Sequence, residues 1–254
     1  LFRSVRREIF EHVGGFAEEG PLSHYSDVDI CLKIRQAGFL VVWTPHTIVL
    51  QSEKSVRAQS TDLQISSEEA LQLRDREHAL YEKWLPAIAH DGAYNENLSL
   101  AGQGFEIETN IDLVTQPLPW RPVPVALAIA ADPYGCGHYR IIHPGHCMTM
   151  AGVADVRVSN RHYTPVEMER LQPDTWVLQR QTTDVQYEFI QRTSKLSRAF
   201  KVGELDDYLP NLPMKSAHRS HMPKDILRAM RRWLSAMDRF VVSTEPLAEA
   251  LGAL

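Results

Sequence analysis

Hydrophobic and polar positions alternate along the chain in a pattern that separates short buried strands from amphipathic helices. In the second half, strand patterns alternate with helical patterns, and the first strand pattern, Val123–Ala131, is a continuous apolar run typical of a parallel strand. We expect strands over Val123–Ala131, Asp155–Ser159, Trp176–Gln179, Phe200–Glu204 and Phe240–Ser243. We expect helices over Tyr139–Met150, Val185–Ser197 and Pro223–Met237. This alternation predicts an α/β fold with a doubly wound, Rossmann-like parallel sheet.

In the first half, the same pattern predicts two helices that end at glycines. One covers Arg6–Val13 and ends at Gly14 and Gly15, where a positive φ costs little. The other covers Asp27–Ala37, has apolar residues at helical spacing and ends before Gly38. We further expect a buried strand over Phe39–Thr44, a short strand over Ile48–Leu50 and a long helix over Ser66–Trp84.

Charge and proline content place a domain boundary near the middle of the chain. Residues 1–115 carry 10 Lys and Arg against 18 Asp and Glu, whereas residues 116–254 carry 17 against 14. Between the acidic and the weakly basic part, the stretch Gln116–Pro124 holds four prolines and so has few backbone donors for regular structure. We predict a first domain over residues 1–115, a proline-rich linker over 116–124 and a second domain over 125–254.

The composition is typical of folded globular domains. The chain has 254 residues, of which 44% are hydrophobic and 23% charged, with a mean hydropathy of -0.27, and these values exclude disordered and collagen-like classes. No apolar run approaches the roughly 20 residues of a membrane span. Three cysteines are too few for a disulfide scaffold, so we expect a cytoplasmic protein. Because the chain begins at Leu1 and ends inside a helical pattern, we also expect an excerpt of a longer protein.

Two carboxylates at the start of the second helix are the strongest candidates for catalytic residues in the first half of the chain. Asp27 and Asp29 fall where unpaired N–H groups and the helix dipole stabilise negative charge. A carboxylate held there can act as a general base, and it can equally serve as a helix cap. The pattern alone leaves both roles open.

Two motifs surround these carboxylates. The chain reads Arg7-Glu-Ile-Phe-Glu-His-Val-Gly-Gly-Phe-Ala-Glu18 and then Ser26-Asp-Val-Asp-Ile-Cys-Leu-Lys-Ile-Arg-Gln-Ala-Gly-Phe39. Together they resemble the C-terminal half of the GT-A catalytic domain of family 2 glycosyltransferases. The resemblance implies that Asp27 is the base that deprotonates the acceptor hydroxyl in an inverting displacement. It also implies a substrate-binding role for Gly14, Gly15, Phe16, Asp29 and Arg35.

Three positions depart from the family pattern. Ser26 replaces a glutamate before the aspartate, Ala17 replaces an aspartate after G-G-F, and Gln51 stands where many members place a histidine near the metal or diphosphate. The family holds Mg²⁺ or Mn²⁺ through a D-x-D motif, and the one Asp-x-Asp of this sequence is Asp27-Val-Asp29. We therefore expect a divalent cation in a complete GT-A unit and no metal ligands in this fragment.

A glycine turn follows the first apolar strand of the second half. It reads Gly135-Cys-Gly-His-Tyr-Arg140. Such glycines let backbone amides approach a ligand at a helix N-terminus, or they serve turn geometry alone. Together with Val177–Gln181, Gly203–Asp207 and Asp238–Thr244, the turn resembles the N-terminal Rossmann-like domain of GT-B glycosyltransferases of O-antigen and surface-polysaccharide synthesis. The resemblance implies that Gly135, Gly137, Tyr139 and Arg140 bind ligand.

Charged residues also fall at the ends of later strands. Glu204, Asp206 and Asp207 lie at the carboxyl end of a predicted strand, and Arg180 follows the strand before it. Open α/β sheets bind ligands at this edge. The three acids either line a site, with Arg180 as the partner of the acids or of an anionic ligand, or form a solvated turn.

Two other interpretations start from single features. A Cys and His cluster falls within twelve residues, but its spacing matches no standard zinc motif; it consists of Cys136, His138, His143, His146 and Cys147. The arginines around Arg228–Arg232 could face nucleic acid or a membrane surface. Apolar residues at helical spacing favour instead an amphipathic helix packed on a sheet; they are Ile226, Met230, Trp233, Leu234 and Met237.

We therefore expect a fragment of a bacterial-type glycosyltransferase that moves a hexose-type sugar from a nucleotide-sugar donor to a hydroxyl of a glycan or lipid-linked glycan. Alone, the fragment is expected to transfer little or no sugar. We expect no nucleic-acid partner, and peripheral attachment to the inner membrane stays open because lipid-linked acceptors lie there. The alternative function is a non-catalytic glycan-binding or scaffolding module with a decayed site.

Overall fold

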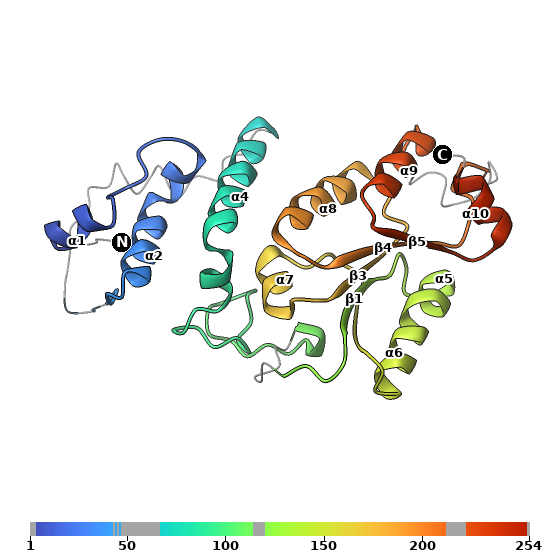
Figure 1. The fold of residues 1–254 in the computed structure, drawn as a ribbon, viewed down its shortest axis with the longest axis horizontal. Helices are drawn as coiled ribbons and strands as arrows, with labels where there is room; N and C mark the ends of the chain where they lie inside the picture. The colour runs from blue at the N-terminus through green and yellow to red at the C-terminus, as the bar shows by residue number, and fades with distance from the viewer. Residues whose placement is uncertain are drawn as a thin grey trace. The chain divides into compact units, whose positions relative to one another are not determined.

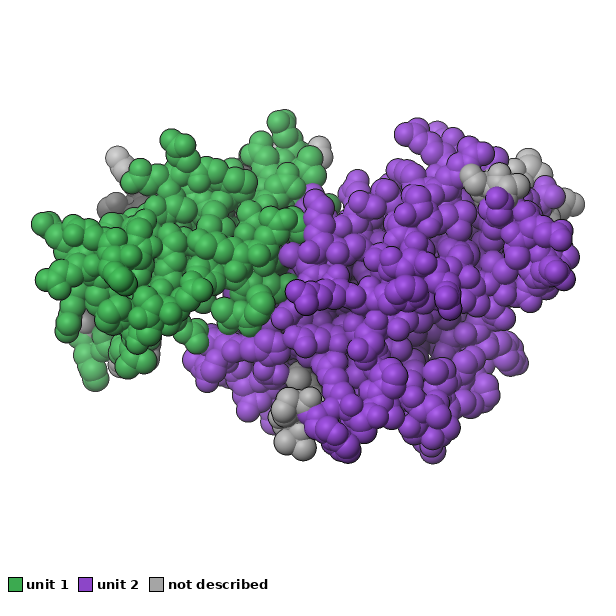
Figure 2. Space-filling model, in the orientation of Figure 1, with its two compact units in different colours: residues 1–87 green, residues 88–254 purple. Residues whose placement is uncertain are grey.

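The chain forms two compact units. The computed structural model describes residues 4–42, 44, 46, 67–113, 120–211 and 222–252. The units are Leu1–Ala87 and Ile88–Leu254, which Figure 2 distinguishes by colour. Residues 88–113 therefore belong to the second unit, and the division lies upstream of the expected linker. Of that linker, residues 116–119 lie outside the described residues, and residues 120–124 form no helix or strand.

The second unit is built on a parallel sheet (Figure 1). Within the described residues its strands are β1 (Val125–Ile129), β2 (Asp155–Ser159), β3 (Thr175–Gln179), β4 (Phe200–Leu205) and β5 (Arg239–Val242). They lie in the order β2-β1-β3-β4-β5, and every neighbouring pair is parallel. The five strands predicted in this half are confirmed, and the fold is α/β and Rossmann-like. The strand order reverses between β1 and β3.

Helices cover both faces of this sheet (Figure 1). α7 (Pro165–Leu171), α8 (Asp184–Leu196) and α9 (Ile226–Ser235) lie over one face. The other face is covered by one continuous helical segment, made of α5 (Gly135–Gly137), the π-helical turn η3 (His138–Ile142) and α6 (His143–Met150). The helix α10 (Glu245–Gly252) follows β5.

Alternate side chains of the strands form two cores of different character. Towards α7, α8 and α9 the strands present large residues such as Leu127, Trp176 and Leu178, which pack with the fully buried Met230 and Trp233 of α9. Towards α6 the core is made of small residues, with Ala128 and Ala130 against Ile141. Small side chains let this helix lie close to the sheet, and the start of the helix is thereby fixed near the end of β1.

Two helices of the second unit begin at capping boxes. The Thr164 side chain accepts a hydrogen bond from the Glu167 amide while the Glu167 carboxylate accepts one from the Thr164 amide, and Thr183 and Gln186 repeat this at α8. α7 is absent from the predicted elements, although Thr164-Pro-Val-Glu167 carries the pattern of a helix start. With only seven residues, its apolar spacing gives a weak signal.

The amphipathic interpretation of the basic helix is confirmed. On α9, Met230 and Trp233 are fully buried and Ile226 packs on the same core, while Arg228 and Arg231 are exposed. The arginines thus follow from the helix's outward face. Among the helices of the described residues, none combines the length and apolar character that crossing a membrane requires.

The first unit is helical in the part that the structure describes. It contains α1 (Arg7–His12), the 3-10 turn η1 (Pro21–Tyr25), α2 (Ser26–Gln36) and most of α4 (Ser67–Ala89), which continues past the expected end at Trp84. Gly14, Gly15 and Gly38 have φ values of 80°, 63° and 84°. These left-handed conformations confirm the glycine helix ends expected from the sequence.

The strand expected over Phe39–Thr44 is wrong for the described residues. Residues 39–42 form no regular secondary structure and pair with no described strand, and Leu40 and Val42 are 88% and 76% exposed. An apolar run forms a strand only when a neighbouring strand takes up its backbone N–H and C=O groups, and none of the described residues does so. The strand expected over Ile48–Leu50 lies outside the described residues, as does Gln51. A GT-A arrangement of this unit stays a prediction.

Candidate functional site at the carboxyl edge of the sheet

The carboxyl edge of the sheet gathers charged residues from separate parts of the chain. Arg140 lies on η3 after β1, Arg180 follows β3, and Glu204 and Asp206 stand at the end of β4. Asp207 comes next and is exposed. This edge lies beside the reversal of strand order between β1 and β3, the position at which open α/β sheets bind ligands.

The glycine turn after β1 is required by the geometry of the backbone. Gly135 has a φ of 47°, which side chains other than hydrogen disfavour. A Cβ on Gly137 would lie 1.8 Å from the carbonyl oxygen of Asp132, so any larger residue would force the turn open. The turn is also closed by the Asp132 carboxylate, which accepts a hydrogen bond from the Tyr134 amide at 2.9 Å. Geometry therefore accounts for both glycines, and a ligand contact at their amides stays a prediction.

A buried glutamine from β3 holds this turn in place. The Gln179 side chain is fully buried, and its Oε1 accepts a hydrogen bond from the Ala131 amide at 2.9 Å. Its Nε2 lies 3.5 Å from the carbonyl oxygen of Cys136. Gln179 thus ties the ends of β1 and β3 together, and it is missing from the predicted site. A polar residue that ends the buried run Trp176–Leu178 is the signal that could have found it.

Two ion pairs neutralise two of the three acids of the edge, Glu204 and Asp206. The Arg140 Nε lies 2.7 Å from Glu204 Oε1, and the Arg180 Nε and NH2 groups lie 2.8 and 2.9 Å from the two oxygens of Asp206. Burial by itself would raise the pKa of Asp206, but hydrogen bonds from Arg180 and Cys136 outweigh it and lower that pKa. The second oxygen of Glu204, a residue only 4% exposed, has no hydrogen-bond partner within the described residues.

Cys136 adds a thiol to this cluster. Its Sγ and one oxygen each of Asp206 and Asp207 lie within 4.8 Å of one another. The hydrogen bond to Asp206, together with burial, raises the pKa of the Cys136 thiol. Because the thiolate is the form that binds metals and attacks electrophiles, a cation would have to displace both this proton and Arg180. A thiol with two carboxylates suits Zn²⁺ better than Mg²⁺ or Mn²⁺.

The Cys and His cluster noted in the sequence does not come together as one site in the described part of the chain. Cys136 is grouped with Asp206 and Asp207 and not with histidines. Cys147 Sγ lies 3.6 Å from His143 Nε2 on the surface of α6, and His138 stacks on His143 at 6.0 Å between ring centroids. Tyr139, predicted to bind ligand, is 75% exposed beside His138.

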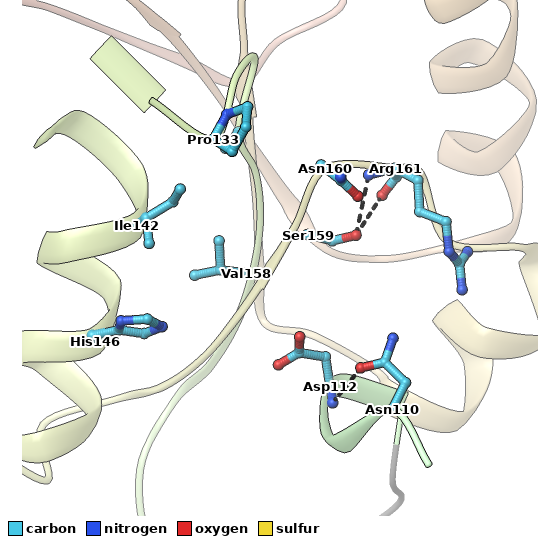
Figure 3. Close-up of a pocket in the computed structure, with 10 residues that line it drawn as sticks. Asn110, Asp112, Pro133, Ile142, His146, Val158, Ser159, Asn160 and Arg161 are labelled. Carbon is cyan, nitrogen blue, oxygen red and sulfur yellow. Dashed lines mark hydrogen bonds between the residues drawn. The ribbon is translucent and has the colours of Figure 1, made fainter. Parts of the chain in front are cut away.

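A pocket of about 300 Å³ lies at the ends of β1 and β2 (Figure 3). Its walls come from the segment before β1, the end of β2 with the residues that follow it, and one side of α6. The lining residues are Asn110, Asp112, Ala130, Pro133, Ile142, His146, Val158, Ser159, Asn160 and Arg161. None of these belongs to the predicted site. The polar run Ser159-Asn-Arg161 at the end of a predicted strand is a signal that could have found it.

In the first unit, the structure separates the two aspartates of α2. Asp27 is exposed in the first turn, and its Oδ1 accepts a hydrogen bond from the Val28 amide at 2.8 Å. Asp29 is fully buried. Its Oδ1 lies 2.6 Å from Lys83 Nζ and 2.8 Å from Trp84 Nε1, and its Oδ2 lies 2.8 Å from Lys33 Nζ. A ligand could reach Asp29 only by displacing a lysine, whereas Asp27 faces solvent.

The remaining residues predicted in the first unit lie around these helices. Lys33 also donates to the carbonyl oxygen of Gly15 at 3.1 Å, which ties the glycine turn to α2. Phe16 is half exposed and packs edge-on against Phe10 at 5.2 Å between ring centroids. Arg35 is exposed near the end of α2. Their substrate contacts stay predictions.

The Mg²⁺ or Mn²⁺ that the family resemblance implies does not fit Asp27-Val-Asp29. Burial would raise the pKa of Asp29, but hydrogen bonds from Lys33, Lys83 and Trp84 lower it, so the carboxylate is ionised and already neutralised by two ammonium groups. A divalent cation placed between Asp27 and Asp29 would have to replace them.

The fold and this edge define a Rossmann-like α/β domain. Part of the chain is similar to the protein printed as "Uncharacterized protein y4gI" of Sinorhizobium fredii (strain NBRC 101917 / NGR234), at 32% identity over 105 residues. The match covers 41% of this chain and 11% of that protein, so the chain spans a small part of its relative. No family model matches the sequence. No solved structure matches it either.

Proposed function

We propose that the chain is part of a glycosyltransferase that moves a sugar from a nucleotide-sugar donor to a hydroxyl of a glycan or lipid-linked glycan in surface-polysaccharide synthesis. The first unit would supply the base of a GT-A unit, and the second unit would supply a ligand-binding edge of a separate GT-B unit. The proposed setting is the cytoplasm or the inner face of the membrane. The activity belongs to the polypeptide in which the chain occurs.

The observation that supports the proposal is the set of paired polar side chains at the carboxyl edge of the sheet. Arg140 on η3 and Arg180 after β3 each pair with an acid at the end of β4, and Gln179 fixes the turn after β1. Groups held in this way need no reorganisation when a polar ligand arrives, which is the condition for tight recognition and for catalysis. Each of the two ion pairs is neutral as a whole, and this favours a ligand rich in hydroxyl groups over one that carries a large net charge.

Asp27 supports the chemical step in this proposal. Its carboxylate is exposed and is held at the first turn of α2 by the Val28 amide. In the step, the carboxylate takes the proton of the acceptor hydroxyl as its oxygen forms a bond to the anomeric carbon. The bond from that carbon to the nucleoside diphosphate breaks on the opposite side, so the configuration inverts. The nucleoside diphosphate leaves with the bonding electrons.

A glycan-binding module without transfer activity is the second candidate. The observation that favours it is the burial of Asp29 between Lys33 and Lys83, which removes the second acid of the motif from solvent. Ser26 at the first position of α2 also leaves Asp27 without the neighbouring glutamate of the family pattern. Under this candidate, glycans bind and no donor is consumed.

Product analysis separates the two candidates. The protein, in its natural polypeptide context, is incubated with UDP-, GDP- and dTDP-hexoses and with oligosaccharide and lipid-linked acceptors, and products are identified by mass spectrometry and NMR. The proposal predicts a new glycosidic bond with inverted configuration and release of nucleoside diphosphate. Glu11→Gln, an exposed acid on α1, serves as matched control and leaves transfer unchanged. Glycan binding without consumption of any donor would favour the binding module, and a product of retained configuration would contradict Asp27 as the base.

A further inference from the structure

We infer that the pocket at the ends of β1 and β2 binds a single uncharged sugar ring of a glycan. The inference rests on the proposed function for the identity of the glycan. The class of ligand, a sugar ring, follows from the residues that line the pocket, all of which belong to the second unit.

One wall of the pocket is held in place by hydrogen bonds from β2 and from the residues that follow β2. The 3-10 turn η2 (Ile111–Leu113) carries this wall. Tyr163 Oη donates to the carbonyl oxygen of Asp112 at 2.9 Å, and Arg157 NH1 donates to that of Ile111 at 2.8 Å. The Asn110 Oδ1 accepts a hydrogen bond from the Asp112 amide at 3.1 Å. Three contacts thus fix the turn, and the Asp112 side chain is presented from a rigid backbone.

The charge of the pocket is negative and uncompensated. The carboxylate of Asp112 has no hydrogen-bond donor among the described residues, and in Figure 3 it projects with His146 towards the same central space. The other charged group of the wall, the Arg161 guanidinium, is engaged by both oxygens of Glu167, at 2.9 and 2.7 Å. An unpaired carboxylate repels phosphates and accepts hydrogen bonds from hydroxyl groups.

The remaining walls divide into a polar and an apolar side. Ile142 of η3 and Val158 of β2 lie near each other on one side of the pocket, with Pro133 on the same side (Figure 3). Ala130 also lines the pocket. Asn110 supplies an amide group beside Asp112, and Asn160 supplies another next to Ser159 and Arg161. A pyranose ring has this same division, because its C–H groups are apolar while its hydroxyls both donate and accept.

The size of the pocket limits the ligand to one ring. About 300 Å³ lies at the lower end of the range for ligand pockets. A nucleoside diphosphate is larger, and its phosphates would meet the charge of Asp112. Except for the imidazole of His146, no lining residue offers an aromatic ring on which a base could stack. The pocket therefore fits the acceptor glycan better than the donor nucleotide.

An NMR titration tests this site. The ¹⁵N-labelled chain is titrated with the methyl glycosides of glucose, galactose, mannose, rhamnose and N-acetylglucosamine, and with glucose 1-phosphate as the charged comparator. We expect at least one methyl glycoside to shift the amides of Asp112, Ser159, Asn160 and Arg161 saturably, with a dissociation constant of about 1 mM. Glucose 1-phosphate is expected to leave these amides unshifted.

Two variants and a control make the result decisive. Asp112→Ala removes the charged acceptor and should weaken the glycoside by about tenfold or more. Asn160→Ala, at an exposed position, tests the same pocket should Asp112→Ala fold poorly. Glu188→Ala, which removes an exposed carboxylate from α8, should leave the affinity unchanged.

The inference is overturned if no methyl glycoside shifts these amides up to about 10 mM, if glucose 1-phosphate binds as tightly, or if neither pocket variant weakens binding. The readout is separate from sugar transfer. Sugar transfer without glycoside binding would contradict the sugar-binding pocket and leave the proposed function intact. Glycoside binding without sugar transfer would support the pocket and contradict the proposed function.

Discussion

Arg180 and Asp206 join the ends of β3 and β4 through two parallel hydrogen bonds of 2.8 and 2.9 Å. The pair is mostly buried, since the two side chains are 17% and 8% exposed. Arg180 adopts a φ of 50°, a left-handed conformation that is uncommon outside glycine. The Arg180 guanidinium is therefore held in a fixed position at the carboxyl edge of the parallel sheet, where open α/β sheets bind ligands.

Removing this arginine should destabilise the second unit. Arg180→Ala leaves the Asp206 carboxylate buried without its main partner, and breaking a buried pair in this way costs about 3 kcal/mol. Urea unfolding followed by circular dichroism measures the change. Asp184→Ala, which removes a 72% exposed partner of Arg232, should change the free energy of unfolding by less than about 1 kcal/mol. Equal effects of the two variants would contradict the structural role of the Arg180 pair.

Gly137 should tolerate no side chain. In Gly137→Ala the new Cβ would meet the Asp132 carbonyl at 1.8 Å, so the turn after β1 must open, at a cost of about 2 kcal/mol or more. Gly104→Ala is the matched control, because no atom lies within 4 Å of a Cβ there; its effect should stay within about 0.5 kcal/mol. Thermal unfolding of the two variants measures the difference. A Gly137→Ala protein as stable as the control would show that the turn is wrongly described.

The first unit should lose stability in acid through Asp29. The fold lowers the pKa of Asp29 below its unfolded value of about 3.9. The stabilisation is therefore complete above that pH and is lost as the pH falls through the folded pKa. Asp29→Asn should remove this pH dependence and cost about 3 kcal/mol at pH 7. Hydrogen exchange of the α2 amides reports both effects, and an unchanged acid sensitivity in Asp29→Asn would assign it to another group.

Cys136 should react more slowly than Cys147 with iodoacetamide. Its hydrogen bond to Asp206 and its partial burial raise its pKa, so little thiolate is present at pH 7. Cys147 is exposed. Mass spectrometry of time points gives the two rates. The Arg180→Ala variant should not speed the reaction of Cys136, because Arg180 favours the thiolate; alkylation of Cys136 as fast as that of Cys147 would refute the described environment.

Much of the fold of the second unit follows from the sequence because its central strands β1 and β3 are largely buried. A run such as Val125–Ile129 is apolar throughout, so such a strand can be predicted without its neighbours. The run at residues 39–42 is equally apolar and yet forms no strand, since pairing depends on a partner that a local pattern does not contain. α7 escapes prediction for the opposite reason, because it is short and only its capping box marks it.

The candidate site follows from the sequence only in part. Arg180 and the acids at the end of β4 could be expected together, since parallel strands end at one edge. Their pairing depends on side-chain direction: Glu204 and Asp206 are two residues apart and so point to the same face, and each meets a different arginine. The pocket depends on Tyr163 holding Asp112, which lies 51 residues earlier, and no local pattern contains that contact.

In the proposed reaction, the Asp27 carboxylate is the base for sugar transfer. The most direct test compares the transfer rate of Asp27→Asn with that of the unaltered protein, in the natural polypeptide context and at saturating donor and acceptor. Loss of a general base predicts a fall in kcat of about 10²- to 10⁴-fold, with an unchanged KM and an unchanged α2 exchange pattern. A kcat for Asp27→Asn equal to that of the unaltered protein would contradict the claim and leave Asp27 as a residue that only stabilises the start of α2.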